Sequence, residues 1–301
     1  MKVAGLSLGK IKERLWGYLR LIFTLDVLIP FLTLSVGLGM RGSLRYPRPL
    51  FSLTPILGVI IALIHPGIIG AAMAGRAFRE ILSPRILSRF ELGGVIAVGM
   101  GIPIGVMAYS RAWQPLGVWI IGSGLLFYWH WLSLRAGRQV HILRETVGAV
   151  LLVPLPLFFS WTIITGNFSP DREIGLAMLI FGLLALSANL GRAWSEAGRP
   201  EPSSGSLFGK ATLIIAIFIF SFLLLLLGIH EGVFLPPRML YLKYGGVIAY
   251  VCGLILYYLG LRNMMNKTAK NKLTRYILYS VIPIILLVFW LAYRGRGLAF
   301  M

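Results

Sequence analysis

Arginines stand beside acidic residues in two polar connections of an otherwise apolar chain. Arg76 and Arg79 precede Glu80 in one connection, and Arg192 precedes Glu196 in the other. Guanidinium groups hold phosphate through paired, charge-assisted hydrogen bonds, whereas carboxylates are the oxygen ligands that Mg²⁺ prefers. The two connections therefore point to the headgroup of an anionic amphiphile, held by arginine directly or through a metal ion. The alternative is that these arginines contact lipid headgroups and only orient the chain in the membrane.

Two ionisable residues lie inside apolar runs, where a charge is costly unless it faces protein or a cavity. Asp26 is a candidate for hydrogen bonding to a ligand headgroup or for accepting a proton, and a helix-packing role with an arginine or backbone group is equally open. His65 precedes Pro66 and Gly67 at an expected kink. Because no second histidine or cysteine follows at helical spacing, we expect His65 to be a packing residue rather than a metal ligand.

A further candidate is His130, which lies in the aromatic segment Phe127–Trp131 ahead of Arg135 and Arg138. Aromatic rings at the end of a span usually form the interfacial belt, and this is the favoured interpretation. The same rings are suited to shielding an allylic carbocation through cation–π attraction. Arg135 and Arg138 are further donors for an anionic headgroup.

The composition identifies the class of protein that must position these residues. Of 301 residues, 57% are hydrophobic and 13% are charged, far more apolar than a soluble domain of this length. The net charge of +19 does not indicate nucleic acid as a partner, because the basic residues lie between apolar runs. The single cysteine, Cys252, excludes a disulfide framework and a cysteine-ligated metal cluster, and we expect it to be an inert packing thiol.

Apolar runs of bilayer-spanning length recur along the chain and predict an all-α integral membrane protein with nine transmembrane helices. The runs are Gly17–Met40, Leu53–Ala74, Leu92–Tyr109, Leu116–Leu134, Thr146–Thr165, Ile174–Leu190, Ala211–Ile229, Tyr244–Leu261 and Tyr276–Tyr293. Kinks in a packed bundle are predicted at the prolines within these runs, which are Pro66, Pro103, Pro154, Pro156 and Pro283. Just before the fifth run, Glu145 is expected to pair with Arg144 or Arg138.

The distribution of basic residues predicts the orientation. With the N-terminus inside, 20 of the 29 lysines and arginines fall on the cytoplasmic side, Arg144 and Arg192 among them. The other 9, which include Arg172 and Arg238, fall on the opposite side, so the C-terminus is expected outside. Residues 1–16 then form a cytoplasmic segment and residues 17–301 a single nine-helix domain. The start of the chain lacks the pattern of a cleavable targeting segment, which favours a prokaryotic plasma membrane.

Four segments of this chain follow a recognisable order: Tyr18–Leu21 (YLRL), Ser83–Leu92 (SPRILSRFEL), Tyr128–Arg138 and Glu196–Gly209. In these segments the chain resembles the UbiA superfamily of intramembrane prenyltransferases. The family has a YLRL opening in its first helix, then SGRISPREAL, then YSxPLRLKR, and a loop after helix six at the corresponding places. The resemblance implies a UbiA-like bundle of nine helices, in which two acidic cytoplasmic motifs hold Mg²⁺ and, through it, the diphosphate of a polyprenyl donor.

The chain departs from the family at both acidic motifs. The first falls on Gly75–Arg79, where arginines replace the acidic residues, and Glu80 is the nearest carboxylate. In the second, Arg192 and Glu196 occupy the two acidic positions, so one carboxylate remains. Fewer carboxylates are present than two bridging magnesium ions usually require.

Two functions follow as hypotheses. The first is a catalytically degenerate UbiA-like protein that binds an isoprenoid, quinone, pigment or lipid in an intramembrane cavity without a cofactor, alone or as a subunit of a membrane complex. The alternative is an active prenyltransferase that uses Mg²⁺ to move a polyprenyl chain from its diphosphate to an aromatic or lipid acceptor. A small-solute transporter is disfavoured, because no inverted repeat is detected.

Overall fold

The computed structural model describes residues 29–40, 101–109, 111–136, 142–196, 204–265 and 271–297, apart from residues 31, 35, 38, 39, 102 and 106. All the regular secondary structure in these residues is helical. From residue 113 onward the elements are α7 (Trp113–Ala136), α8 (Ile142–Leu152), α9 (Pro154–Thr165), α10 (Arg172–Glu196), α11 (Ser204–His230), the short α12 (Pro236–Tyr241), the π-helix η2 (Leu242–Gly246), α13 (Val247–Met265) and α14 (Asn271–Gly297). The all-α prediction is therefore confirmed for this part of the chain.

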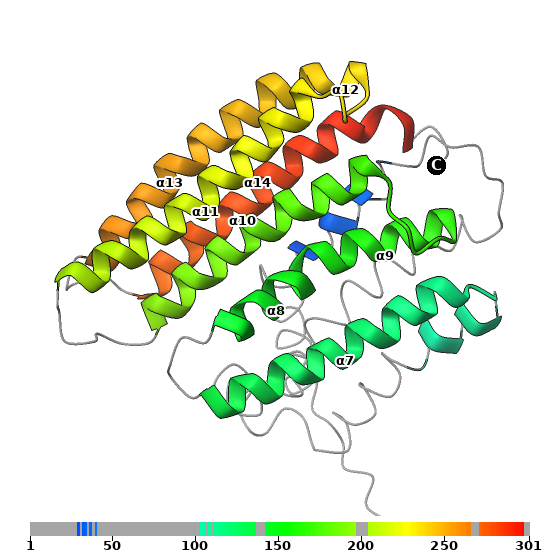
Figure 1. Ribbon diagram of the computed structural model, residues 1–301, viewed down its shortest axis with the longest axis horizontal. Helices are drawn as coiled ribbons and strands as arrows, with labels where there is room; N and C mark the ends of the chain where they lie inside the picture. Colours follow the sequence, from blue (N-terminus) through cyan, green and yellow to red (C-terminus); the bar gives the residue numbers. More distant parts are fainter. Residues whose placement is uncertain are drawn as a thin grey trace, which may run out of the picture.

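Successive segments of membrane-spanning length run antiparallel, and α10 lies at the centre of the described helices. Figure 1 shows α10, α11, α13 and α14 as long rods side by side, with α7, α8 and α9 along one flank. α10 contacts α8, α9, α11 and α14. Its first residue, Arg172, pairs with Glu231 just after the end of α11, and its Asn189 bonds to Glu145 at the start of α8. The arrangement is an up-and-down helix bundle.

Four helical segments are long and apolar enough to cross a bilayer: Ile142–Thr165, Arg172–Trp194, Gly209–His230 and Pro236–Arg262. A shorter apolar segment covers Ser280–Tyr293 in α14. These segments correspond to the fifth to ninth predicted spans and support a protein of the membrane. The second predicted span lies outside the described residues, as do most of the first and third, so the count of nine and the orientation stay predictions.

The helices extend beyond the apolar runs from which they were predicted. α10 covers 25 residues, Arg172–Glu196, although the apolar run ends at Leu190. At 1.5 Å per residue, the stretch from Glu173 to Arg192 is about 28 Å long, close to the ~30 Å thickness of a hydrocarbon core. Charged residues therefore mark both ends of the membrane-crossing part of α10, and the helix continues past them.

The prolines have different effects. The fifth span is broken at Val153, whose φ of −133° and ψ of −61° are not helical, and Pro154 begins α9 as a first-turn proline. This confirms the predicted kink at Pro154. Pro283 instead lies within α14, which continues through it. At the end of α9, Gly166 takes the left-handed φ of 67° and its N–H bonds to the carbonyl of Thr162.

Aromatic contacts and two pairs of hydroxyl groups hold the long helices together in the core. Phe181 of α10 meets Phe289 of α14 edge-on, with ring centroids 4.6 Å apart. Ser187 and Tyr257 join α10 to α13 at 2.5 Å, and Ser221 and Tyr250 join α11 to α13 at 3.1 Å. Hydroxyl pairs of this kind satisfy polar groups that hydrocarbon could not solvate.

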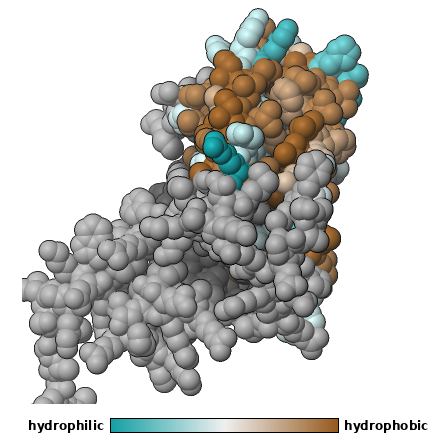
Figure 2. Space-filling model, turned by 90° about the vertical axis from the view of Figure 1, so that its left-hand side faces the viewer, coloured by the Kyte–Doolittle hydropathy of each residue, from teal (hydrophilic) through white to brown (hydrophobic). Residues whose placement is uncertain are grey.

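The surface of α11 and α13 is strongly apolar. Among their exposed side chains are Leu223 and Leu227 of α11 and Ile248 and Tyr258 of α13. Figure 2 shows hydrophobic residues over most of the described surface in that view, with hydrophilic residues at its upper edge and a smaller hydrophilic group lower down. Cys252 of α13 is exposed on this surface, so the expectation that it packs inside the bundle is wrong. A face of this kind is stable only against lipid or another apolar surface.

Candidate functional site

The best-defined polar site among the described residues is centred on Glu145 and is called the Glu145 cluster; it consists of Arg144, Glu145, Asn189 and Arg192. Glu145 is fully buried. Arg144 donates from Nε to Glu145 Oε1 at 2.6 Å, and Arg192 Nη2 lies 3.8 Å from Oε2. Both arginine side chains are more than four-fifths buried. Two guanidinium groups therefore surround one buried carboxylate where α8 meets α10.

The local sequence explains why these side chains meet. Glu145 lies in the first turn of α8, where the helix dipole favours a negative charge. One turn later, Gly148 leaves room for two side chains: a Cβ there would lie 2.8 Å from Nε1 of Trp129 and 3.2 Å from Nδ2 of Asn189. Asn189 uses this space to donate to the Glu145 carbonyl at 3.2 Å. The glycine is thus needed for α7, α8 and α10 to converge.

Arg192 is the one predicted site residue whose side chain the structure describes. The backbones of His130, Arg135 and Glu196 are helical, in α7 and α10, but their side chains lie outside the described part. Asp26, Arg76, Arg79, Glu80 and Arg138 fall wholly outside the described residues, as does His65. The predicted pairing of Glu145 with Arg144 is confirmed. The convergence of Arg144 and Arg192 on one carboxylate was not predicted.

The position of Arg192 does not suit Mg²⁺. A guanidinium carries only donors and has no lone pair to offer a metal ion, and here it is paired with a carboxylate. Within the described ranges, no three side chains of histidine, cysteine, aspartate or glutamate come close enough to share an ion. The Glu145 cluster therefore presents two guanidinium groups in fixed positions. Each can donate paired hydrogen bonds to an anionic or carbonyl-bearing headgroup.

A second buried ionic group, the Glu173 cluster, lies at the other end of α10 and consists of Glu173, Arg238 and Tyr293. Arg238 is 5% exposed; its guanidinium lies 3.8 Å from the Glu173 carboxylate and 4.5 Å from the centre of the Tyr293 ring. Tyr293 donates its hydroxyl proton to Glu173. Arg238 Nη1 also donates to the carbonyl of Met40 at 3.3 Å. The cluster therefore joins α10, α12 and α14 to Met40.

Sequence reasoning missed the Glu173 cluster. Arg238 had been assigned only to the outer side by its charge, and its partners are distant along the chain. The one local signal is that Pro236 and Pro237 start α12 just before Arg238. Prolines at the start of a helix fix the backbone of its first turn, and Arg238 in the first turn of α12 is buried in the bundle.

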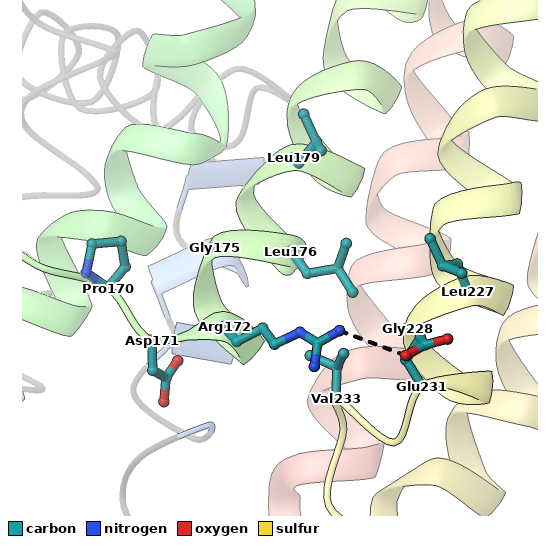
Figure 3. A pocket seen from close by; sticks show the side chains of 10 residues that line it. All are labelled: Pro170, Asp171, Arg172, Gly175, Leu176, Leu179, Leu227, Gly228, Glu231 and Val233. Atoms are coloured by element: carbon teal, nitrogen blue, oxygen red, sulfur yellow. Dashed lines mark ion pairs between the residues drawn. The ribbon is translucent and has the colours of Figure 1, made fainter.

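A groove opens at the same end, between the start of α10 and the end of α11. It has a volume of about 430 Å³ and is called the α10–α11 groove. Figure 3 shows Arg172 reaching from α10 toward Glu231, with Leu176, Leu179 and Leu227 extending along the groove from this ion pair. The groove is thus charged at one end and apolar along its length.

No protein-family model, curated protein or solved structure matches this chain.

Proposed function

We propose that this chain is a UbiA-like membrane protein that binds the polar head of an isoprenoid, quinone, pigment or lipid at the Glu145 cluster, without catalysing its transfer. The observation that carries the proposal is the convergence of Arg144 and Arg192 on the buried carboxylate of Glu145. Arg192 stands where the resemblance places the first acidic residue of the second motif. A donor to anions thus replaces a ligand for a metal ion.

The energetics favour a binding role over mere orientation of the chain. Arginines that only mark the cytoplasmic side remain at the headgroup surface, where they are solvated. Arg144 and Arg192 are instead largely desolvated and held by Glu145, which has no exposed surface. Burying a charge costs several kcal/mol per ion in desolvation, and the attraction between the partners offsets this only when their geometry is close. Charged side chains that are buried in a membrane protein despite this cost commonly contact a ligand.

The location of the cluster fits the predicted topology. Arg144 and Arg192 were both assigned to the cytoplasmic side, and Arg172 and Arg238 to the opposite side. Each pair lies together at its own end of α10. We infer that the Glu145 cluster lies at the cytoplasmic interface of a prokaryotic plasma membrane. The apolar surface of α11 and α13 leaves room for lipid or for another membrane subunit.

Binding of tritium-labelled geranylgeranyl diphosphate to the purified protein in detergent, with EDTA present throughout, tests the proposal. We expect saturable binding without metal. Arg192→Gln should weaken it about tenfold or more, because it removes a charge-assisted hydrogen bond. Arg192→Lys keeps the charge but loses the paired donors of the guanidinium group. Its affinity should therefore lie between that of the unaltered protein and that of Arg192→Gln.

Arg262→Gln is the matched control, since Arg262 is an exposed cation in the last turn of α13 and does not belong to the Glu145 cluster. Equal weakening by Arg192→Gln and Arg262→Gln would reduce the effect to general charge attraction and contradict the proposal. A chelator-sensitive prenylated product, formed when Mg²⁺ and an aromatic acceptor are added, would favour the alternative function of an active prenyltransferase.

A further inference from the structure

The α10–α11 groove has the shape of a site for one lipid chain. Its apolar wall begins beside the charged end and continues through Leu176 and Leu179, one and two turns into α10. Leu179 and Leu227 are about half exposed, so the groove is open to the surrounding hydrocarbon along its side. Gly175 widens it, because a Cβ there would have nothing within 4 Å.

The backbone around the groove is fixed independently of any ligand. Asp171 caps α10 by accepting the N–H of Ile174 at 2.9 Å. Gly228 allows α10 and α11 to approach, because a Cβ there would lie 2.3 Å from Leu176 and 2.8 Å from Phe234. Past the end of α11, Gly232 turns the chain with a φ of 63°. The groove is therefore a preformed feature of the helix packing.

The charged end of the groove carries both signs. Arg172 and Glu231 are paired at 3.8 Å, but their side chains are 72% and 47% exposed. An exposed pair at this distance is weak and exchanges partners readily. With Asp171, the rim holds two carboxylates and one guanidinium, so its formal charge is negative. A headgroup with only a phosphate meets net repulsion there, whereas one that also bears an amine does not.

We propose that the α10–α11 groove binds a phospholipid whose headgroup carries a phosphate and a primary ammonium group, as in phosphatidylethanolamine. The phosphate pairs with Arg172 and the ammonium group donates hydrogen bonds to Glu231. One acyl chain lies along Leu176, Leu179 and Leu227. A choline headgroup has the same charges but no N–H to donate, and a glycerol headgroup lacks the positive charge, so both bind less tightly.

Native mass spectrometry on protein taken from nanodiscs tests the proposal. The nanodiscs contain phosphatidylethanolamine, phosphatidylcholine and phosphatidylglycerol in equal amounts and with identical acyl chains. We expect one retained lipid per chain, with phosphatidylethanolamine favoured over each of the others by about threefold or more. Preference for phosphatidylglycerol, or no preference, overturns the assignment.

Two variants and a control locate the site. Gly175→Leu fills the groove without a backbone clash and should remove the retained lipid of every class. Glu231→Gln should keep a retained lipid but bring the ratio of phosphatidylethanolamine to phosphatidylcholine to about one. Leu254→Trp changes the exposed face of α13, away from the groove, and should change nothing. Retention by Gly175→Leu equal to that of the unaltered chain contradicts the proposal.

This site is separate from the Glu145 cluster. Arg172 at the charged end of the groove and Arg192 of the Glu145 cluster lie at opposite ends of α10, about 30 Å apart along the helix axis. Gly175→Leu should leave the binding of geranylgeranyl diphosphate unchanged, and Arg192→Gln should leave lipid retention unchanged. Failure of either proposal can thus be told from failure of the other.

Discussion

Replacing Arg238 by methionine and Glu173 by glutamine, singly and together, measures what the Glu173 cluster contributes to the free energy of unfolding. Arg238→Met removes the ion pair at 3.8 Å, the hydrogen bond to Met40 and the contact with the Tyr293 ring. Removing one partner of a buried pair costs about 3–5 kcal/mol when the geometry is close. Because 3.8 Å is at the long end for a pair, we expect the lower value, about 3 kcal/mol.

The double variant should recover part of this loss, since Glu173→Gln removes the carboxylate that Arg238→Met leaves unpaired. The interaction free energy from the cycle should be about 2 kcal/mol. Equilibrium unfolding in mixed micelles with increasing dodecyl sulfate, followed by circular dichroism, provides the four values. The matched control is the same cycle on Arg172 and Glu231, an exposed pair at the same distance, which should couple by less than ~0.5 kcal/mol. Equal coupling in the two cycles would refute the claim that burial makes the Glu173 cluster a structural centre.

Two further predictions concern packing and the membrane. Gly228→Ala should destabilise the protein by about 1–3 kcal/mol in the same assay, because its Cβ would overlap Leu176; Gly124→Ala, where a Cβ meets nothing within 4 Å, should be neutral or slightly stabilising. In intact membranes, Cys252 should resist a charged maleimide and react only after dissolution in dodecyl sulfate, because a charged reagent does not enter hydrocarbon. Asn167 lies exposed in the connection between α9 and α10, so a cysteine placed there in a Cys252→Ala background should react without dissolution. Rapid labelling of Cys252 itself in intact membranes would contradict its placement against lipid.

Helix type and rough position could be predicted from the sequence, because both depend on local hydrophobicity. The run Thr146–Thr165 became α8 and α9, with the expected break at Pro154, since an internal proline removes a donor whatever its neighbours. The ends were predicted less well. α10 continues six residues past Leu190, to Glu196, because a helix need not end where its apolar run does.

The site was predictable only where its members are close in sequence. Glu145 and Arg144 are adjacent, and their pairing followed from the helix dipole and charge. Arg192 was selected through the resemblance, but its contact with Glu145 depends on how α8 packs against α10. The Glu173 cluster brings together α10, α12 and α14, and no spacing rule connects them.

The central claim, that an anionic amphiphile binds at the Glu145 cluster, is tested most directly by cross-linking a photoreactive analogue of geranylgeranyl diphosphate in membranes and mapping the labelled peptides. The label should appear on the start of α8 and the last turns of α10. It should be removed by excess unlabelled diphosphate and reduced by Arg192→Gln. Labelling confined to the lipid-facing sides of α11 and α13, and unaffected by Arg192→Gln, would contradict the account.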